Sequence, residues 1–65
     1  MTTEYLLYGL APDETRDYMA TLLYVTKDYT QVKRVIDIAS KQGWHSFREA
    51  TYNGEAPNFA NTVNV

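Results

Sequence analysis

The side chains best suited to chemistry gather in one short segment, GWHSFR at positions 43–48. It contains the only histidine and the only tryptophan of the chain. Histidine titrates near neutral pH, which makes His45 the candidate general base and the adjacent Ser46 the candidate nucleophile. Adjacent residues of a strand point to opposite faces, however, so we expect no dyad between the two. We therefore predict a structural role for His45 near the end of a helix; an enzyme centred on His45 is the third alternative for the function.

An aromatic and cationic row begins in the same segment. Trp44, Arg48 and Tyr52 recur every four residues, which places all three on one face if the segment is a strand. Trp, Tyr and Arg dominate the hot spots of protein interfaces, and the same row could stack nucleic-acid bases. The alternative is that Trp44 simply packs in the core under a helix. We predict a binding row of Trp44, Arg48 and Tyr52, with Tyr5 as a neighbour if the first strand pairs alongside.

The charged residues argue against a protein that binds mainly phosphates. The chain has six basic and eight acidic residues and a net charge of −2. Phosphate binding normally comes with a basic excess or a basic stripe. Lys27, Lys33 and Arg34 could form a small phosphate-contacting patch, but such charges are more often a solvated face. Binding to nucleic acid is thus a possible function that the sequence does not favour.

No cofactor or metal site is expected. A structural zinc site needs four ligands, and this chain has one histidine and no cysteine. The acidic cluster of Asp13, Glu14 and Asp17 lacks the glycine and the alternating spacing of a calcium loop. The three glycines are too dispersed to form a phosphate-binding loop.

Length and composition indicate a single small domain that associates with itself. A chain of 65 residues buries only about 60% of its unfolded surface, so its stability is marginal. Domains of this size usually need disulfides, a metal or oligomerisation. This chain has no cysteine, and we expect no metal site, so oligomerisation is left. Six tyrosines, two phenylalanines and one tryptophan exceed what a small two-layer core holds. We therefore expect a homodimer.

The expected location is the cytoplasm. A chain without cysteine fits a reducing compartment, and the start MTTE lacks the basic region of a secretory leader. No apolar run approaches the ~18 residues of a membrane span, so we expect no membrane interaction. The size is that of small accessory proteins of bacteria and their phages.

The first part of the chain predicts two strands. Residues 4–10 are aromatic and aliphatic on both faces, which indicates a central strand or one covered on both sides. Residues 12–26 are ambiguous. Pro12 could begin a helix, whereas the β-branched and aromatic run at 21–26 is typical of a strand. We favour a loop through Asp17 followed by a strand over 19–25.

Residues 28–42 form the clearest helix. Asp28 and Gln31 match a capping box, and Gly43 can adopt the left-handed conformation that ends a helix. An apolar stripe at i, i+3, i+4 and i+7 predicts the face that packs on a sheet. The stripe consists of Val32, Val35, Ile36 and Ala39.

A third strand is predicted over 44–52, and Asn53 with Gly54 signals a tight turn. Residues 55–65 contain Pro57 and many asparagines, so we expect an irregular C-terminal tail. The strand–helix–strand succession over 19–52 predicts a crossover that leaves its two strands parallel.

These elements predict a small two-layer α+β domain, ββαβ, with a three-stranded sheet and one main helix at about 28–42. One helix covers only one face of such a sheet. The other face must be exposed to solvent, covered by the tail or buried in a partner. We therefore expect a non-enzymatic interaction module, a homodimer that binds another macromolecule through its aromatic surface.

Overall fold

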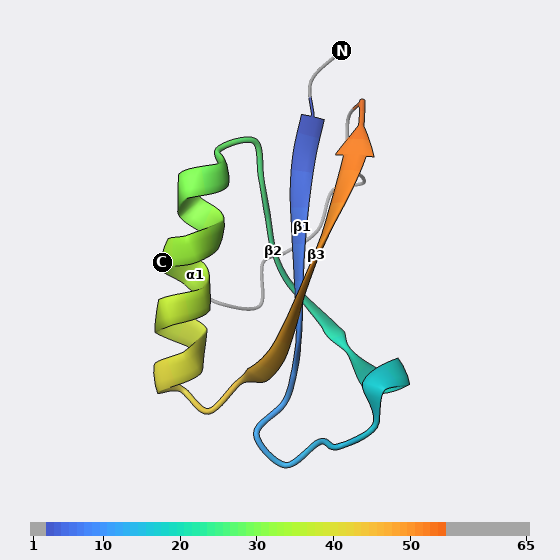
Figure 1. The fold of residues 1–65 in the computed structure, drawn as a ribbon, viewed down its shortest axis with the longest axis vertical. Helices are drawn as coiled ribbons and strands as arrows, with labels where there is room; N and C mark the ends of the chain where they lie inside the picture. Colours follow the sequence, from blue (N-terminus) through green and yellow to red (C-terminus); the bar gives the residue numbers. More distant parts are fainter. Residues whose placement is uncertain (1–2, 55–65) are drawn as a thin grey trace.

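The computed structural model describes residues 3–54 and shows a helix packed on one face of a three-stranded sheet (Figure 1). The elements in chain order are β1 (Thr3–Leu10), the 3-10 turn η1 (Asp17–Met19), β2 (Thr21–Thr26), α1 (Tyr29–Lys41) and β3 (His45–Asn53). The strand order is β2-β1-β3, and both pairings are antiparallel. The predicted α+β fold with ββαβ order is confirmed.

Strand β1 occupies the centre of the sheet because it is apolar on both faces. Leu7 is fully buried on the helix face, while Leu6 and Leu10 are buried on the other. Strands β2 and β3 each run antiparallel to β1, so they are parallel to one another, as predicted. They are not neighbours, however, because β1 lies between them.

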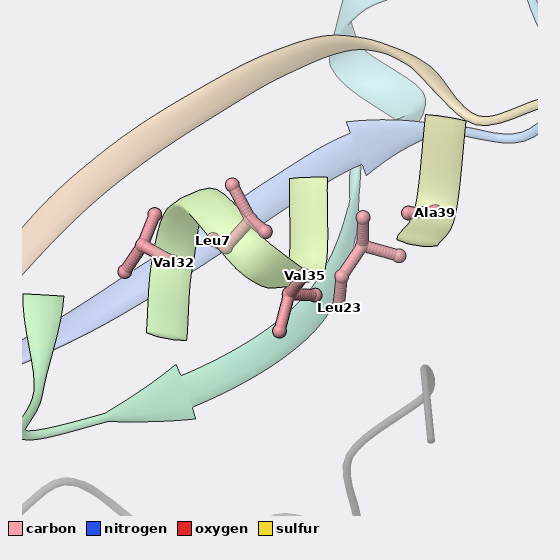
Figure 2. Packing of buried hydrophobic residues seen from close by; sticks show 5 residues of the cluster. All are labelled: Leu7, Leu23, Val32, Val35 and Ala39. Atoms are coloured by element: carbon pink, nitrogen blue, oxygen red, sulfur yellow. The ribbon is translucent and has the colours of Figure 1, made fainter. Parts of the chain in front are cut away.

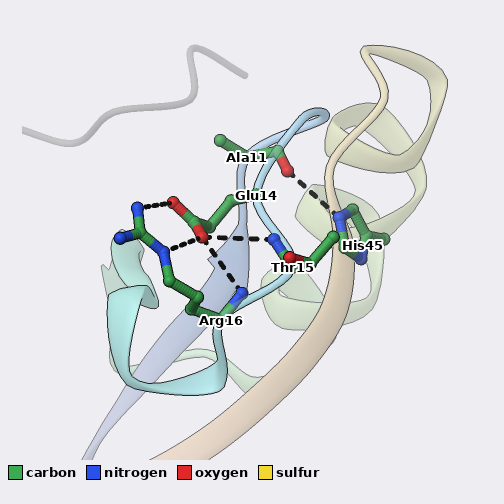
Figure 3. Close-up of polar contacts among 5 residues, drawn as sticks. All are labelled: Ala11, Glu14, Thr15, Arg16 and His45. Atoms are coloured by element: carbon green, nitrogen blue, oxygen red, sulfur yellow. Dashed lines mark hydrogen bonds and ion pairs between the residues drawn. The ribbon is translucent and has the colours of Figure 1, made fainter.

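The segment between β1 and β2 is a loop with a single 3-10 turn, and β2 follows it at Thr21–Thr26. The favoured prediction of a loop followed by a strand is thus confirmed, and the alternative of a helix that begins at Pro12 is wrong. The Glu14 carboxylate organises this loop: it accepts hydrogen bonds from the backbone amides of Thr15 and Arg16 and pairs with the Arg16 guanidinium at 2.7 Å (Figure 3). The hydrogen bond from Arg16 lowers the pKa of Glu14 to about 2. A carboxylate held in this way favours a turn over the first turn of a helix.

Helix α1 begins at the predicted cap. Asp28 accepts hydrogen bonds from the amide and the hydroxyl of Thr30, at 3.0 and 2.7 Å, and these bonds lower its pKa. The capping box predicted a bond to the Gln31 amide; that amide instead donates to the backbone carbonyl of Asp28. The helix ends as predicted: Gly43 has φ +98°, and its amide donates to the carbonyl of Ser40.

Among residues 3–54, the buried core is entirely aliphatic (Figure 2). The apolar stripe of α1 faces the sheet, and Leu7 of β1 and Leu23 of β2 point toward it. The cluster consists of Leu7, Leu23, Val32, Val35 and Ala39. No aromatic side chain within residues 3–54 is fully buried, so the aromatic residues lie around this small core and at the surface.

Two further predictions concern the C-terminal tail and the membrane. The irregular tail at 55–65, including Pro57, lies outside the described residues. Within residues 3–54, no helix has the length and the apolar character needed to cross a membrane.

Candidate binding surface on the open face of the sheet

The two faces of β3 are defined by its pairing with β1. On the face that packs against α1, Tyr5 and Leu7 lie opposite Thr51 and Glu49. We call the opposite side of the sheet the open face, because α1 does not cover it. There, residues of β1 pair with three residues of β3, which form the open-face row: Arg48, Ala50 and Tyr52.

The open-face row combines a cation and an aromatic ring at the surface. Tyr52 is 45% exposed, and the Arg48 side chain is 57% exposed. The small Ala50 lies between them on the same face. Arg48 Nη2 lies 3.4 Å from Asp17 Oδ1, which links the row to η1.

Turn η1 extends the exposed apolar area beyond β3. It lies on the other side of the strands from α1 (Figure 1). Tyr18 is 79% exposed and Met19 is 45% exposed. The Arg16 guanidinium lies 5.8 Å from the centre of the Tyr18 ring, within the range of a cation–π contact. The exposed aromatic ring of η1 is therefore accompanied by an arginine.

Trp44 does not belong to this row, and its predicted place there was wrong. It precedes β3, its amide donates to the carbonyl of Ala39, and its ring is half-buried against the core cluster. The cause is a bulge in β3: the register shifts between Tyr8 and Leu10, and Ser46 has φ +54°. A bulge breaks the alternation of side chains on which the prediction depended.

Tyr5 pairs alongside β3 as predicted, opposite Thr51, but it lies on the helix face. Its ring meets Tyr29 edge to face, with centroids 5.1 Å apart. Tyr29 hydrogen-bonds to the Glu49 carboxylate, which raises the pKa of Tyr29. These contacts join the start of α1 to the sheet, so Tyr5 has a packing role on the opposite side from Arg48 and Tyr52.

The expected separation of His45 and Ser46 was also wrong. His45 Nδ1 lies 3.0 Å from Ser46 Oγ, because the left-handed conformation of Ser46 turns its side chain toward the imidazole. His45 Nε2 lies 3.0 Å from the carbonyl oxygen of Ala11 (Figure 3). A carbonyl only accepts, so Nε2 carries the proton, and in the neutral ring Nδ1 accepts from the Ser46 hydroxyl. Ser46 and His45 thus form a pair of a hydroxyl and a base. The bond from His45 to Ala11 also joins β3 to the loop after β1.

The three cations proposed for phosphate contacts are exposed, but they do not share a face with the row. Lys27 lies in the turn before α1, and Lys33 and Arg34 lie on α1 itself. Helix α1 covers the side of the sheet opposite to Arg48 and Tyr52. The structure thus separates the two groups that a nucleic-acid surface would combine.

The acidic cluster near η1 is engaged in ion pairs. Glu14 pairs with Arg16, and Asp17 pairs with Arg48. Among the described residues, no three His, Asp or Glu side chains are grouped so that they could hold a metal ion.

Sequence reasoning missed Asp17, Tyr18 and Met19 as part of the exposed surface. The run DYM precedes the strand-forming residues directly, and strand propensity extends over Met19. The available signal was the charged residue at the start of this run, which is unsuited to a covered strand.

Comparisons with family models, with curated proteins and with solved structures find no match to this chain.

Proposed function

We propose that this chain is a non-enzymatic interaction module that acts as a homodimer and binds another protein through the open face of its sheet. The observation that carries the proposal is the exposure of Tyr52 and Arg48 together on the sheet face that α1 leaves uncovered. Rings and guanidinium groups of this kind supply most of the affinity of protein interfaces. The cytoplasmic location expected from the composition is part of the proposal.

The distribution of aromatic side chains supports an interface. Within residues 3–54, the core is aliphatic and every aromatic residue keeps some contact with solvent. Tyr18 and Met19 add exposed apolar surface next to the row through the Asp17–Arg48 ion pair. Exposed aromatic and apolar side chains gathered near an arginine are common features of protein-binding sites.

Row variants test the binding surface. Immobilised wild-type protein, Tyr52→Ala, Arg48→Ala and the control Lys33→Ala, which changes the exposed side of α1, are compared for the proteins that they retain. We expect a partner that is retained by the wild type and the control and lost by both row variants. A partner retained equally by all four would contradict the assignment of the open face. Circular dichroism of each variant confirms that the fold is intact.

Sedimentation equilibrium tests the homodimer. The average mass should rise from monomer to dimer between low and high micromolar concentration. A strict monomer at high micromolar concentration would show that the homodimer is wrong. The binding of a partner protein would still be tested by the row variants.

Titration with oligonucleotides tests the nucleic-acid alternative. Under the proposal, single- and double-stranded probes give no shift at low salt. Binding that weakens steeply with salt and is lost in a Lys33→Ala, Arg34→Ala double variant would replace the protein partner with nucleic acid.

The Ser46–His45 contact gives the enzymatic alternative a specific form. If His45 activates the Ser46 hydroxyl, Oγ attacks the phosphorus of a fluorophosphonate probe, fluoride leaves, and the proton passes to Nδ1. The interaction module predicts no labelling. Stoichiometric labelling of the wild type that is absent in both Ser46→Ala and His45→Ala would overturn the non-enzymatic assignment.

A further inference from the structure

Strand β3 has one paired edge and one outer edge. It is the last strand in the order β2-β1-β3, so within residues 3–54 only β1 pairs with it. Its nine residues, His45–Asn53, make it a long edge. The bulge at Ser46 disturbs its first two positions, and the regular part is 47–53. Exposed edges of this length readily pair with another strand.

We propose that two copies of the chain pair antiparallel through the outer edges of β3, with Ala50 facing Ala50 at the two-fold axis. The inference depends on the proposed homodimer and specifies how it forms. In a continuous sheet with a two-fold axis perpendicular to it, opposed residues lie on the same face, so the register must centre on one residue. The midpoint of the regular segment 47–53 is Ala50.

Side chains across this interface are complementary. On the open face, Arg48 of each copy lies opposite Tyr52 of the other, which sets a guanidinium against a ring twice. The small Ala50 permits close approach at the axis. On the helix face, Glu49 lies opposite Thr51 of the second copy, where the hydroxyl can donate to the carboxylate. Both charges of the segment thus face a neutral partner that can interact with them.

The neighbouring registers are less favourable. A centre at Arg48 opposes two arginines, and a centre at Glu49 opposes two carboxylates; like charges directly opposite each other destabilise strand pairs. A centre at Thr51 avoids that conflict but leaves Arg48 beyond Asn53 of the other copy and shortens the pairing. The sequence of β3 therefore selects Ala50 as the centre.

Pairing in this register would produce one six-stranded sheet in the order β2-β1-β3-β3-β1-β2. Both α1 helices would lie on the same face, and the two open-face rows would join across the axis on the other. The dimer would thus present one continuous surface made from Arg48 and Tyr52 of both copies. A partner would meet two equivalent sites, which increases its overall affinity.

A single cysteine tests the axis, because the natural chain contains none. Two Ala50→Cys residues would face each other at the Cα separation of opposed residues in a sheet, within reach of a disulfide. Mild oxidation should convert most of this variant to a covalent dimer. The control Lys33→Cys, at an exposed position of α1, should stay monomeric under denaturing conditions. Equal cross-linking of both variants would overturn the register.

A charge pair tests the register independently. Thr51→Lys places a cation opposite Glu49 of the second copy, whereas Thr51→Glu places a carboxylate there. The dimer dissociation constant should fall about 2- to 30-fold in the first and rise by a similar factor in the second. Ser40→Lys and Ser40→Glu make the same changes in net charge on α1 and should shift it much less.

The outcomes separate the two proposals. If the wild type dimerises but Ala50→Cys does not cross-link and the Thr51 variants match the Ser40 variants, the edge pairing is wrong and the homodimer stands. If the wild type is strictly monomeric, both the homodimer and the edge pairing are wrong. In either case the row variants still test the binding of a partner protein.

Discussion

His45 and Ala11 are joined by a hydrogen bond between Nε2 and the backbone carbonyl oxygen, 3.0 Å apart and partly buried. The bond connects the start of β3 to the loop that leaves β1, just beyond the last pairing of the two strands, Leu10 with His45. The same carbonyl also accepts the Glu14 amide at 2.9 Å. One carbonyl thus fixes both the loop and the corner where α1 passes into β3.

Replacing His45 with alanine should destabilise the fold. The change removes the bonds to Ala11 and Ser46, and a hydrogen bond of this kind contributes about 0.5–1.5 kcal/mol. We expect the free energy of unfolding, measured in urea, to fall by about 1–2 kcal/mol. A His45→Asn variant that retains one bond should lie between alanine and the wild type. An unchanged midpoint for alanine would show that the corner does not depend on the imidazole.

Ser46 should be sensitive to the shape of its side chain. With φ +54°, a non-glycine residue bears a strain of roughly 1–2 kcal/mol. Ser46→Gly removes the strain and one hydrogen bond, so its stability should stay within about 1 kcal/mol of the wild type. Ser46→Val should be clearly less stable, because β-branched residues are rarely found at positive φ. Equal stability of the two variants in urea would contradict the left-handed conformation.

Gly43 and Gly54 form a matched pair of positions. Both have positive φ, +98° and +116°. A Cβ at Gly43 would lie 2.9 Å from Pro12 Cγ, whereas at Gly54 the nearest atom among residues 3–54 is 3.9 Å away in Tyr52. Gly43→Ala should therefore lower the free energy of unfolding by more than about 1 kcal/mol, and by more than Gly54→Ala does. The reverse order in thermal denaturation would exclude the contact with Pro12.

The aliphatic core should tolerate little loss of volume. Leu7 has no exposed surface, and Leu7→Ala in such a site costs about 2–5 kcal/mol. The total stability of a 65-residue domain is about 3–10 kcal/mol, so this variant should lose a large share of it and unfold at a clearly lower urea concentration than the wild type. Met19→Ala, at an exposed position, should stay within about 0.5 kcal/mol of the wild type. Circular dichroism and urea titration distinguish the two.

Acid should weaken the loop around Glu14. The pKa of Glu14 is about 2 in the folded protein against an ordinary 4.5, so its contribution is complete above pH 4.5 and is lost as the pH falls toward 2. Glu14→Gln cannot titrate, and its stability should decline less over that interval than that of the wild type. The effect should be modest, because this ion pair lies at the surface. If the free energy of unfolding falls equally with pH in both proteins, the ionisation of Glu14 does not cause the loss of stability.

Local sequence determined the elements and their ends. The Asp28 cap, the apolar stripe of α1 and the left-handed Gly43 each depend on residues within one or two helical turns, so the helix could be predicted closely. The two apolar faces of β1 likewise predicted its central place. These features follow from hydrogen bonds and burial that a short segment specifies by itself.

Only the tertiary structure decided how β3 is oriented at its start. The positive φ of Ser46 has no sequence signal, because it arises where the end of α1, the Ala11 carbonyl and the pairing with β1 must be satisfied together. That bulge placed Trp44 against the core cluster, brought Ser46 to His45 and left only Arg48 and Tyr52 of the predicted row on the open face. Composition predicted an aromatic surface, but whether Trp44 belongs to it depended on one backbone torsion that the packed fold imposes.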